Sequence, residues 1–346
     1  MKFIDFFSGI GGFRRGMELA GHECVGFCEF DKFAVASYTA MHTMTEIQRD
    51  YLDMLPKNKR VAEAGKEEYR NGEWYANDIR RIFAEDIPKA DCWCFGFPCQ
   101  DISVAGKQLG FNGARSSLFF RVIRLVQDLE EKDRPTYLFI ENVKNLLSVN
   151  GGTDFLKLLI ALDESGYDTE WQVINSADYV PQNRERVFII GHLRGRSTAK
   201  VFPIERADRE NSVLQIGNFM ATKKRSNPNQ GRIYFVDGIA PCLNKMEGGG
   251  REPYIAIRTI CDMSNAVWHE TYGYITIRKL TPRECFRLQG WSDEYFDRAE
   301  LVSSDRQLYK QAGNGVTVPV IYEIAKRMRV SGRISTRNAG RDRNRK

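Results

Sequence analysis

The sequence predicts an α/β fold, with an open, Rossmann-like sheet and a smaller, mixed second domain. Within residues 2–31 a strand, a glycine turn, a helix and a second strand follow one another. Residues 136–140 form a continuous apolar run that is typical of a buried parallel strand. This α/β rhythm stops between Gly191 and Ile277, where glycine-rich and asparagine-rich loops indicate a second domain.

Composition favours a soluble globular protein. The chain has 346 residues, 42% hydrophobic and 28% charged, which is enough for one large core or two domains. Its net charge of +6 and its pI near 8.8 hint at a polyanionic partner. No apolar run reaches bilayer length and the first residues predict a strand rather than a signal peptide, so we expect a cytoplasmic protein. The 8 cysteines show neither a disulfide framework nor metal-ligand spacing, which predicts reduced thiols and no metal site.

The first strand, at residues 2–7, runs into a glycine turn at 8–12, and the second strand ends at Glu29. Such a turn lets the backbone approach a ligand closely, and an acid at the end of a strand can accept hydrogen bonds from a ribose. The strict dinucleotide fingerprint fails, because Arg14 stands where its third glycine belongs. A plain tight turn therefore stays an alternative.

Residues 45–74 are rich in Lys, Glu and Arg and predict a mostly helical surface insertion. Asp78 follows it, and its carboxylate would suit either an exocyclic amine or a helix N-cap. A short apolar strand at 90–96 then leads to a glycine-flanked loop in which Pro98 fixes the backbone just before Cys99. That presentation is typical of a nucleophile, although a buried structural cysteine is the alternative.

Further polar side chains fall at positions suited to chemistry. Glu141 follows the apolar strand, at the carboxyl edge where open α/β sheets place their ligands. Arg184 and Arg186 alternate in an extended segment, so both would reach one face, where planar cations could hold a carbonyl oxygen or a phosphate. Arg186 is equally a candidate for a structural ion pair. Asn314 lies between two glycines before an apolar helix at 319–328, and its alternative role is that of a simple turn residue.

Taken in order, these motifs resemble the DNA (cytosine-5)-methyltransferase family of bacterial or phage type. The matching pieces span most of the chain and comprise residues 5–12, Glu29, 77–79, 98–100, 141–143, 182–186, 278–291 and 313–316. The resemblance implies the sheet of an S-adenosylmethionine-dependent methyltransferase joined to a target-recognition domain. It also implies an enzyme that methylates C5 of a flipped-out cytosine in a specific short sequence of duplex DNA.

The resemblance assigns catalytic roles as well. Cys99 would add to C6 of the cytosine, because C5 becomes nucleophilic only after that addition. Glu141 would give a proton at N3 as negative charge builds on the ring. Arg184 would contact the base, with Arg186 beside it. Elimination of Cys99 would then release 5-methylcytosine and S-adenosylhomocysteine.

The cofactor that the resemblance implies is S-adenosylmethionine, held by several motifs. Phe7 would face the adenine, Glu29 would bind the ribose, Asp78 would accept from the adenine amine, and Asn314 would close the pocket. The other expected cofactor contacts are Ser8, Gly9, Gly11, Gly12, Ile79, Pro98 and Val316. No metal is expected to take part.

The family pattern divides the chain into residues 1–191 plus 278–330 as the catalytic and cofactor-binding domain and 192–277 as the target-recognition domain. The basic tail, 331–346, is expected to be flexible, and the insertion at 45–74 exceeds the compact family pattern without an assigned function. Expected DNA contacts are Gln100, Ser103 and Lys107 near the predicted nucleophile and Arg225, Arg232 and Arg251 in the recognition domain.

The expected substrate is double-stranded DNA, and the expected role is restriction-modification or phage DNA protection. We expect a monomer, not bound to a membrane, whose partner endonuclease would form no stable complex with it. Three alternatives stay open at this point. They are an RNA cytosine methyltransferase, a nicotinamide-dependent oxidoreductase, and a DNA-binding protein whose catalytic apparatus is silent.

Overall fold

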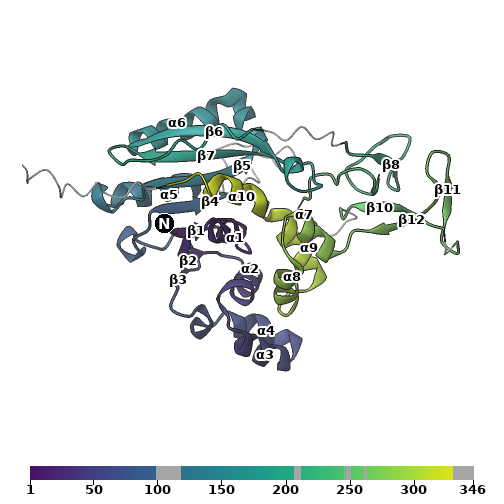
Figure 1. Cartoon of the computed structure of the whole chain (residues 1–346), viewed down its shortest axis with the longest axis horizontal. Helices are drawn as coiled ribbons and strands as arrows, with labels where there is room; N and C mark the ends of the chain where they lie inside the picture. The colour runs from purple at the N-terminus through teal and green to yellow at the C-terminus, as the bar shows by residue number, and fades with distance from the viewer. Residues whose placement is uncertain (99–117, 206–211, 245, 247–250, 261–262, 330–346) are drawn as a thin grey trace, which may run out of the picture.

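The main body of the molecule is a twisted sheet with helices on both faces (Figure 1). The computed structural model describes residues 1–98, 118–205, 212–244, 246, 251–260 and 263–329, so the predicted basic tail lies outside the described residues. Within them the sheet has the strand order β3-β2-β1-β4-β5-β7-β6. The strands are β1 (Lys2–Phe6), β2 (Glu23–Cys28), β3 (Trp74–Ala76), β4 (Cys92–Phe95), β5 (Tyr137–Val143), β6 (Tyr167–Asn175) and β7 (Glu185–Leu193).

Strand direction decides which chain segments meet at the functional edge. Strands β3, β2, β1, β4 and β5 run parallel, whereas β7 pairs antiparallel with β5. The beginning of β7 therefore lies at the same edge as the ends of the parallel strands, and Arg186 pairs with Val143 in the ladder. The predicted strand at 136–140 is longer in the structure, so that Glu141 belongs to β5 rather than following it.

Alternate residues of the central strands pack on opposite faces of this sheet, as the two-residue period of a strand requires. On one face Leu138 and Ile140 join a core with helices α5 (Leu118–Asp128) and α6 (Thr153–Glu164). On the other face Tyr137 and Phe139 join a core with α1 (Gly12–Leu19) and α10 (Val318–Ala325). A Cβ on Gly16 would lie only 2.5 Å from Cβ of Ile321, so this glycine permits the close packing of α1 on α10.

A second, smaller sheet lies to the right of the first in Figure 1. Its strand order is β11-β12-β10-β9-β8, and all its strands fall within the interval in which the α/β rhythm stops or just beyond it. The strands are β8 (Gln215–Asn218), β9 (Arg232–Phe235), β10 (Tyr254–Arg258), β11 (Val267–His269) and β12 (Gly273–Lys279). Between the sheets lie α7 (Pro282–Leu288), α8 (Asp293–Glu300) and α9 (Asp305–Asn314). The predicted α/β class with a smaller mixed unit is confirmed.

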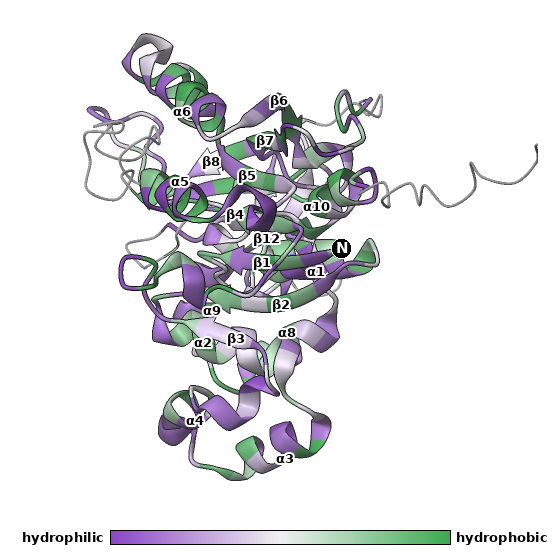
Figure 2. Cartoon of the chain, turned by 90° about the vertical axis from the view of Figure 1, so that its left-hand side faces the viewer, coloured by the Kyte–Doolittle hydropathy of each residue, from purple (hydrophilic) through white to green (hydrophobic). Residues whose placement is uncertain are grey.

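The insertion forms α3 (Glu46–Met54) and α4 (Lys57–Ala64), which follow α2 (Lys32–Tyr38). Figure 2 shows α3 and α4 at the end of the molecule opposite α6. Trp74, predicted as the last residue of the insertion, instead begins β3, because the short run Trp74–Ala76 pairs with the end of β2. Arg14, whose side chain is 6% exposed, donates to both carboxylate oxygens of Glu73 at 2.6 and 2.7 Å. The residue that breaks the dinucleotide fingerprint thus ties α1 to the end of the insertion.

Candidate active site

The ends of β1 and β2 meet at the carboxyl edge through the side chain of Glu29. Its Oε2 accepts the backbone N–H of Gly9 at 2.8 Å, and its Oε1 accepts that of Asp31 at 2.8 Å. Burial raises the pKa of the Glu29 carboxyl, although these two donors act against the rise. The predicted turn and its acid are therefore in direct contact, in the arrangement that could receive a ribose.

The glycines of the turn differ in what surrounds them. Gly9 has a φ of 55°, and a Cβ built on it would meet nothing within 4 Å, so a ligand could approach its backbone. A Cβ on Gly11 would lie 2.4 Å from Nε2 of His42, and one on Gly12 would lie 2.7 Å from Cγ2 of Val316. These two glycines therefore make room for protein rather than for ligand. The contact with Val316 also brings the C-terminal motif back to the turn, as the sequence predicts.

Two further features of this turn are unusual, at Phe7 and at Ser8. Phe7 has a φ of 53°, a left-handed conformation that a non-glycine residue rarely adopts. Among the described residues, the hydroxyl oxygen of Ser8 is buried without a hydrogen-bond partner. Buried hydroxyls are normally satisfied, so an unpartnered one beside an open glycine favours a ligand there.

The side chain of Phe30, which the sequence analysis missed, lies at the same edge. It is 72% exposed although aromatic, and the Arg80 guanidinium lies 5.8 Å from its ring centroid. Nε and Nη2 of Arg80 in turn donate to the carboxylate of Asp78 at 2.8 and 2.7 Å, and this lowers the pKa of the carboxyl. An aromatic residue directly after the acid that ends a strand was the signal in the sequence that could have identified Phe30.

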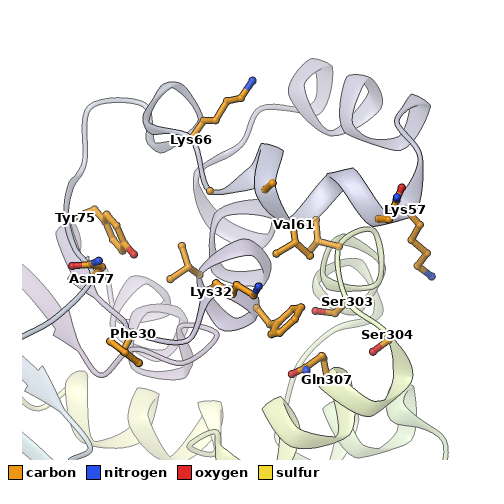
Figure 3. Close-up of a pocket in the computed structure, with 16 residues that line it drawn as sticks. Phe30, Lys32, Lys57, Val61, Lys66, Tyr75, Asn77, Ser303, Ser304 and Gln307 are labelled. Carbon is orange, nitrogen blue, oxygen red and sulfur yellow. The ribbon is translucent and has the colours of Figure 1, made fainter.

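A cavity of about 720 Å³ begins at Phe30 and extends under the insertion. Its volume falls in the range of roughly 300–1,000 Å³ that is usual for small-molecule pockets. Figure 3 shows two groups of lining residues at opposite ends, with Val61 of α4 between them: Phe30, Tyr75 and Asn77, and Ser303, Ser304 and Gln307. The insertion therefore supplies one wall of a cavity that starts next to Glu29.

The end of β4 leads directly toward the predicted nucleophile. Cys99 itself, with Gln100, Ser103 and Lys107, lies outside the described residues, which end before it at Pro98. A Cβ on Gly96 would lie 3.0 Å from Oε2 of Glu141, and Nδ2 of Asn142 donates to the carbonyl oxygen of Phe97 at 3.1 Å. The chain thus leaves β4 against β5, beside the Glu141 carboxylate, immediately before Cys99.

Glu141 and Arg186 form an ion pair across β5 and β7. The distance from Nε of Arg186 to Oε1 of Glu141 is 3.1 Å, and the two side chains are 16% and 12% exposed. Nη1 of Arg186 also donates to the carbonyl oxygen of Glu185 at 2.8 Å. A carboxyl group and a planar cation are therefore side by side at the carboxyl edge, and Arg186 forms an ion pair, which is one of the two roles that the sequence left open for it.

Arg184 is more deeply buried than the sequence suggests, with an exposed fraction of 3%. Its Nη1 donates to the carbonyl oxygen of Leu243 at 3.0 Å, and its Nη2 donates to that of Gly315 at 2.8 Å. These bonds join the start of β7, the segment after β9 and the loop after α9. Among the described residues its Nε has no hydrogen-bond partner, so one donor of Arg184 stays available. Its predicted contact with the base stays a prediction.

The other predicted residues take varied places. Asp78 and Ile79 are buried after β3, and Asn314 is the exposed last residue of α9. Arg225 and Arg251 are exposed around the second sheet. Arg232 is half-buried and donates to the carbonyl oxygens of Asn227 and Pro228, both at 3.1 Å, so its guanidinium is already used to hold a loop.

In the part of the chain that the structure describes, no group of three or more His, Cys, Asp or Glu side chains could hold a metal ion. The helices of that part are also too short or too polar for any of them to cross a membrane.

Comparison with known proteins agrees with this arrangement. A model of the family described as C-5 cytosine-specific DNA methylase matches residues 1–59, 58–239 and 245–329. The chain belongs to this family. The resemblance predicted from the motifs is confirmed, and the protein is a DNA (cytosine-5)-methyltransferase.

Relatives within this methylase family match this chain over nearly its whole length. The Type II methyltransferase M2.ScrFI of Lactococcus lactis subsp. cremoris is 31% identical, and the match covers 95% of this chain and 99% of the relative. The Type II methyltransferase M.HhaI of Haemophilus parahaemolyticus is 30% identical, with 94% and 93% covered.

Solved structures support the methylase fold. The S. pombe Dnmt2 methyltransferase aligns with a TM-score of 0.62 at 18% identity, covering 94% of this chain and 97% of that one. The Entamoeba histolytica methyltransferase EhMeth aligns with a TM-score of 0.61 at 17% identity, covering 93% and 96%. At such identities the likeness concerns the fold alone.

Proposed function

We propose that the enzyme transfers a methyl group from S-adenosylmethionine to C5 of a flipped-out cytosine in duplex DNA, through a covalent bond between Cys99 and C6. The observation that carries the proposal is the pair of Glu141 and Arg186 beside the end of β4. That strand delivers the chain to Cys99 in the next few residues. An acid, a cation and a nucleophile are what addition to a pyrimidine ring requires.

The cofactor site that we propose lies at the ends of β1, β2 and β3. Glu29 would accept the ribose hydroxyls, the exposed Phe30 ring would cover the adenine, and Asp78 would accept from the adenine amine. The open approach to Gly9 and the unpartnered Ser8 hydroxyl fit a ligand with a polar amino-acid end. Bound there, S-adenosylmethionine would supply an electrophilic methyl group. Of the other predicted contacts, Phe7 follows β1, Pro98 follows β4 and Ile79 follows Asp78. Gly11 and Gly12 face His42 and Val316 rather than open space, and Asn314 ends α9.

The protein's own residues would then activate the ring. A free thiol has a pKa of about 8.5, so only a few per cent of Cys99 is thiolate at neutral pH unless its surroundings help. Glu141 would deliver a proton to N3 of the cytosine and so neutralise the charge that builds as the thiolate adds. Arg186 would hold the carbonyl oxygen O2 beside it. Arg184 would chiefly fix the wall of the pocket, with its Nε–H as the donor left for the base.

The substrate that we propose is a specific short sequence in duplex DNA. Flipping a base out of the stack costs a few kcal/mol, which contacts in the pocket and in the vacated helix must offset. Gln100, Ser103 and Lys107, next to Cys99 in the sequence, are our candidates for the vacated position. Residues 192–277 would recognise the sequence, through exposed side chains such as Arg225 and Arg251, while 1–191 and 278–330 would carry catalysis.

The biological role that we propose is restriction-modification or phage DNA protection. The relatives at about 30% identity are named Type II methyltransferases, which supports this role. A partner endonuclease would share the recognition sequence without a stable complex, and the methyltransferase would act as a monomer.

Incubation with labelled S-adenosylmethionine tests the proposal. Mixed-sequence duplex DNA and structured RNA would be offered separately, and the products would be analysed as nucleosides and sequenced. We expect 5-methylcytosine in the DNA, confined to one short motif. Label in the RNA alone, or in neither nucleic acid, would contradict the proposed substrate.

A further inference from the structure

A second cysteine lies in the wall of the proposed base pocket. Cys242 follows β9, and its Sγ is 3.5 Å from Nη1 of Arg184 and 3.8 Å from Nη2 of Arg186. It is exposed to solvent, and the Glu141 carboxylate lies behind Arg186. Arg184 and Arg186, which precede Cys242 by 58 and 56 positions in the sequence, thus form one cluster with its thiol.

The two arginines give this thiol an unusual electrostatic setting. Surrounding protein atoms alone would raise the pKa of the Cys242 thiol, but the charges of Arg184 and Arg186 outweigh that effect and lower it. Cys285, by contrast, is buried without such partners, and burial raises the pKa of its thiol to about 12. Within the described residues, Cys242 therefore combines exposure with stabilisation of its thiolate.

The same cluster holds a donor that is ready for a ligand. Arg184 is only 3% exposed, and among the described residues its Nε–H has no hydrogen-bond partner. An oxygen added to Sγ of Cys242 would lie near Nη1 of Arg184 and Nη2 of Arg186, which are 3.5 and 3.8 Å from the sulfur. Arginine donors of this kind stabilise oxyanions.

We propose that Cys242 is a modification site, at which peroxide oxidises the thiolate to a sulfenic acid held by Arg184 and Arg186. Its place in the base pocket rests on the proposed function, whereas its chemistry rests on the cluster alone. The sulfur attacks one oxygen of hydrogen peroxide, the S–O bond forms and the O–O bond breaks. Hydroxide leaves and takes up a proton to become water, so the sulfur loses two electrons and the peroxide gains them.

The full-length Cys99→Ser protein is the material for the test, because it removes the predicted nucleophile and its own reaction. It is treated with hydrogen peroxide in the presence of dimedone, which labels sulfenic acids, and the labelled cysteines are located by peptide mass spectrometry. We expect label on Cys242 at least about tenfold above that on Cys285. Absence of label on Cys242 would overturn the proposal.

A second comparison separates arginine-assisted reactivity from simple exposure. Adding Arg186→Gln should lower the labelling of Cys242 by at least about threefold and leave Cys285 unchanged. Adding Arg232→Gln, which changes a guanidinium bonded to Asn227 and Pro228, should leave Cys242 unaffected. Labelling that is equal in the Cys99→Ser protein with and without Arg186→Gln would show that the arginines are not the cause.

A pH profile needs no further substitution and does not depend on the folding of the Arg186 variant. Alkylation of Cys242 by iodoacetamide should reach half its maximal rate at a lower pH in the folded Cys99→Ser protein than in the same protein unfolded by guanidinium. A midpoint equal to or above that of the unfolded protein would contradict the proposal. None of these readouts requires methyl transfer, so a failed DNA assay would remove the proposed function without changing this result.

Discussion

Nε of Arg186 lies 3.1 Å from Oε1 of Glu141, and this pair joins β7 to β5 at the edge where the chain turns toward Cys99. The antiparallel direction of β7 is what makes the contact possible, because it returns the start of that strand to the carboxyl edge. An arginine in this position can keep the carboxyl side chain oriented toward a base while itself donating to the base. The two residues therefore act as one recognition unit in our account.

Substitution of Glu141 should affect the chemical step rather than cofactor binding. Glu141→Gln keeps the shape of the side chain but cannot deliver a proton to N3, so single-turnover methylation should slow by about 10²-fold. Glu185→Gln is the matched control, since the neighbouring Glu185 pairs with Lys144, away from Glu141. Cofactor affinity, measured by calorimetry, should be similar in both variants. Unchanged chemistry in Glu141→Gln, with affinity for S-adenosylmethionine lost, would contradict the role.

Phe30 should contribute to the binding of S-adenosylmethionine. Loss of one aromatic contact costs about 0.5–1.5 kcal/mol, so Phe30→Ala should weaken binding roughly twofold to tenfold. Phe83→Ala provides the control, because Phe83 is similarly exposed, at 67% against 72%. Equal affinities of the two variants by calorimetry would show that Phe30 lies outside the site.

Much of this edge could be predicted from the sequence, because its residues lie where strands end. Glu29, Asp78 and Glu141 each come at or near the end of an apolar strand, and the ends of parallel strands meet in space. The place of Cys242 could not be predicted in this way. Its contact with Arg184 depends on how the segment after β9 returns to the first sheet, and local patterns carry no such information.

Other features of the structure also divide into those that follow from local sequence patterns and those that depend on contacts between distant parts of the chain. Two alternating arginines in an extended segment predict a shared face, and both do reach Cys242. The burial of Arg184 follows instead from backbone carbonyls of Leu243 and Gly315, which come from distant parts of the chain. The short strand that begins at Trp74 exists because β2 offers it an edge, and three residues are too few to show a period.

Glu73 should stabilise the fold through Arg14. Glu73→Gln would remove the charge that faces both Nη atoms of the buried Arg14 guanidinium and leave Glu18, bonded to Nε at 2.8 Å, as its remaining charge partner. Because the Glu73 side chain is 20% exposed, we expect a loss of about 2–3 kcal/mol, below the roughly 3–5 kcal/mol of a fully buried pair. The free energy of unfolding, measured with a chemical denaturant, gives this loss. Glu68→Gln, at an exposed site paired only loosely with Lys66, should stay within about 0.5 kcal/mol of wild type. Equal losses in the two variants would refute the special role of Glu73.

Glu284 should make stability depend on pH. Its hydrogen bonds to Arg278 are the main cause that lowers the pKa of the Glu284 carboxyl to about 2, below its usual value of about 4.3. A lowered pKa means that the stabilisation is fully present above the unfolded value and is lost as pH falls toward the folded one. Thermal unfolding of wild type and Glu284→Gln should therefore differ most at pH 7, with the gap closing between about pH 4.3 and 2. A difference in unfolding temperature between the two proteins that stays constant across this pH range would contradict the lowered pKa of Glu284.

The central claim, that Cys99 attacks C6 of a flipped cytosine, is most directly tested by trapping the covalent complex. Fluorine at C5 cannot leave as the C5 proton does, so mixed-sequence duplex DNA with 5-fluorocytosine in place of cytosine should block elimination after methyl transfer. With S-adenosylmethionine, the wild-type protein should form a DNA complex that survives a denaturing gel. Cys99→Ser should bind the same DNA and form no such complex. A stable complex with Cys99→Ser, or none with a wild-type enzyme that methylates ordinary DNA, would contradict the account.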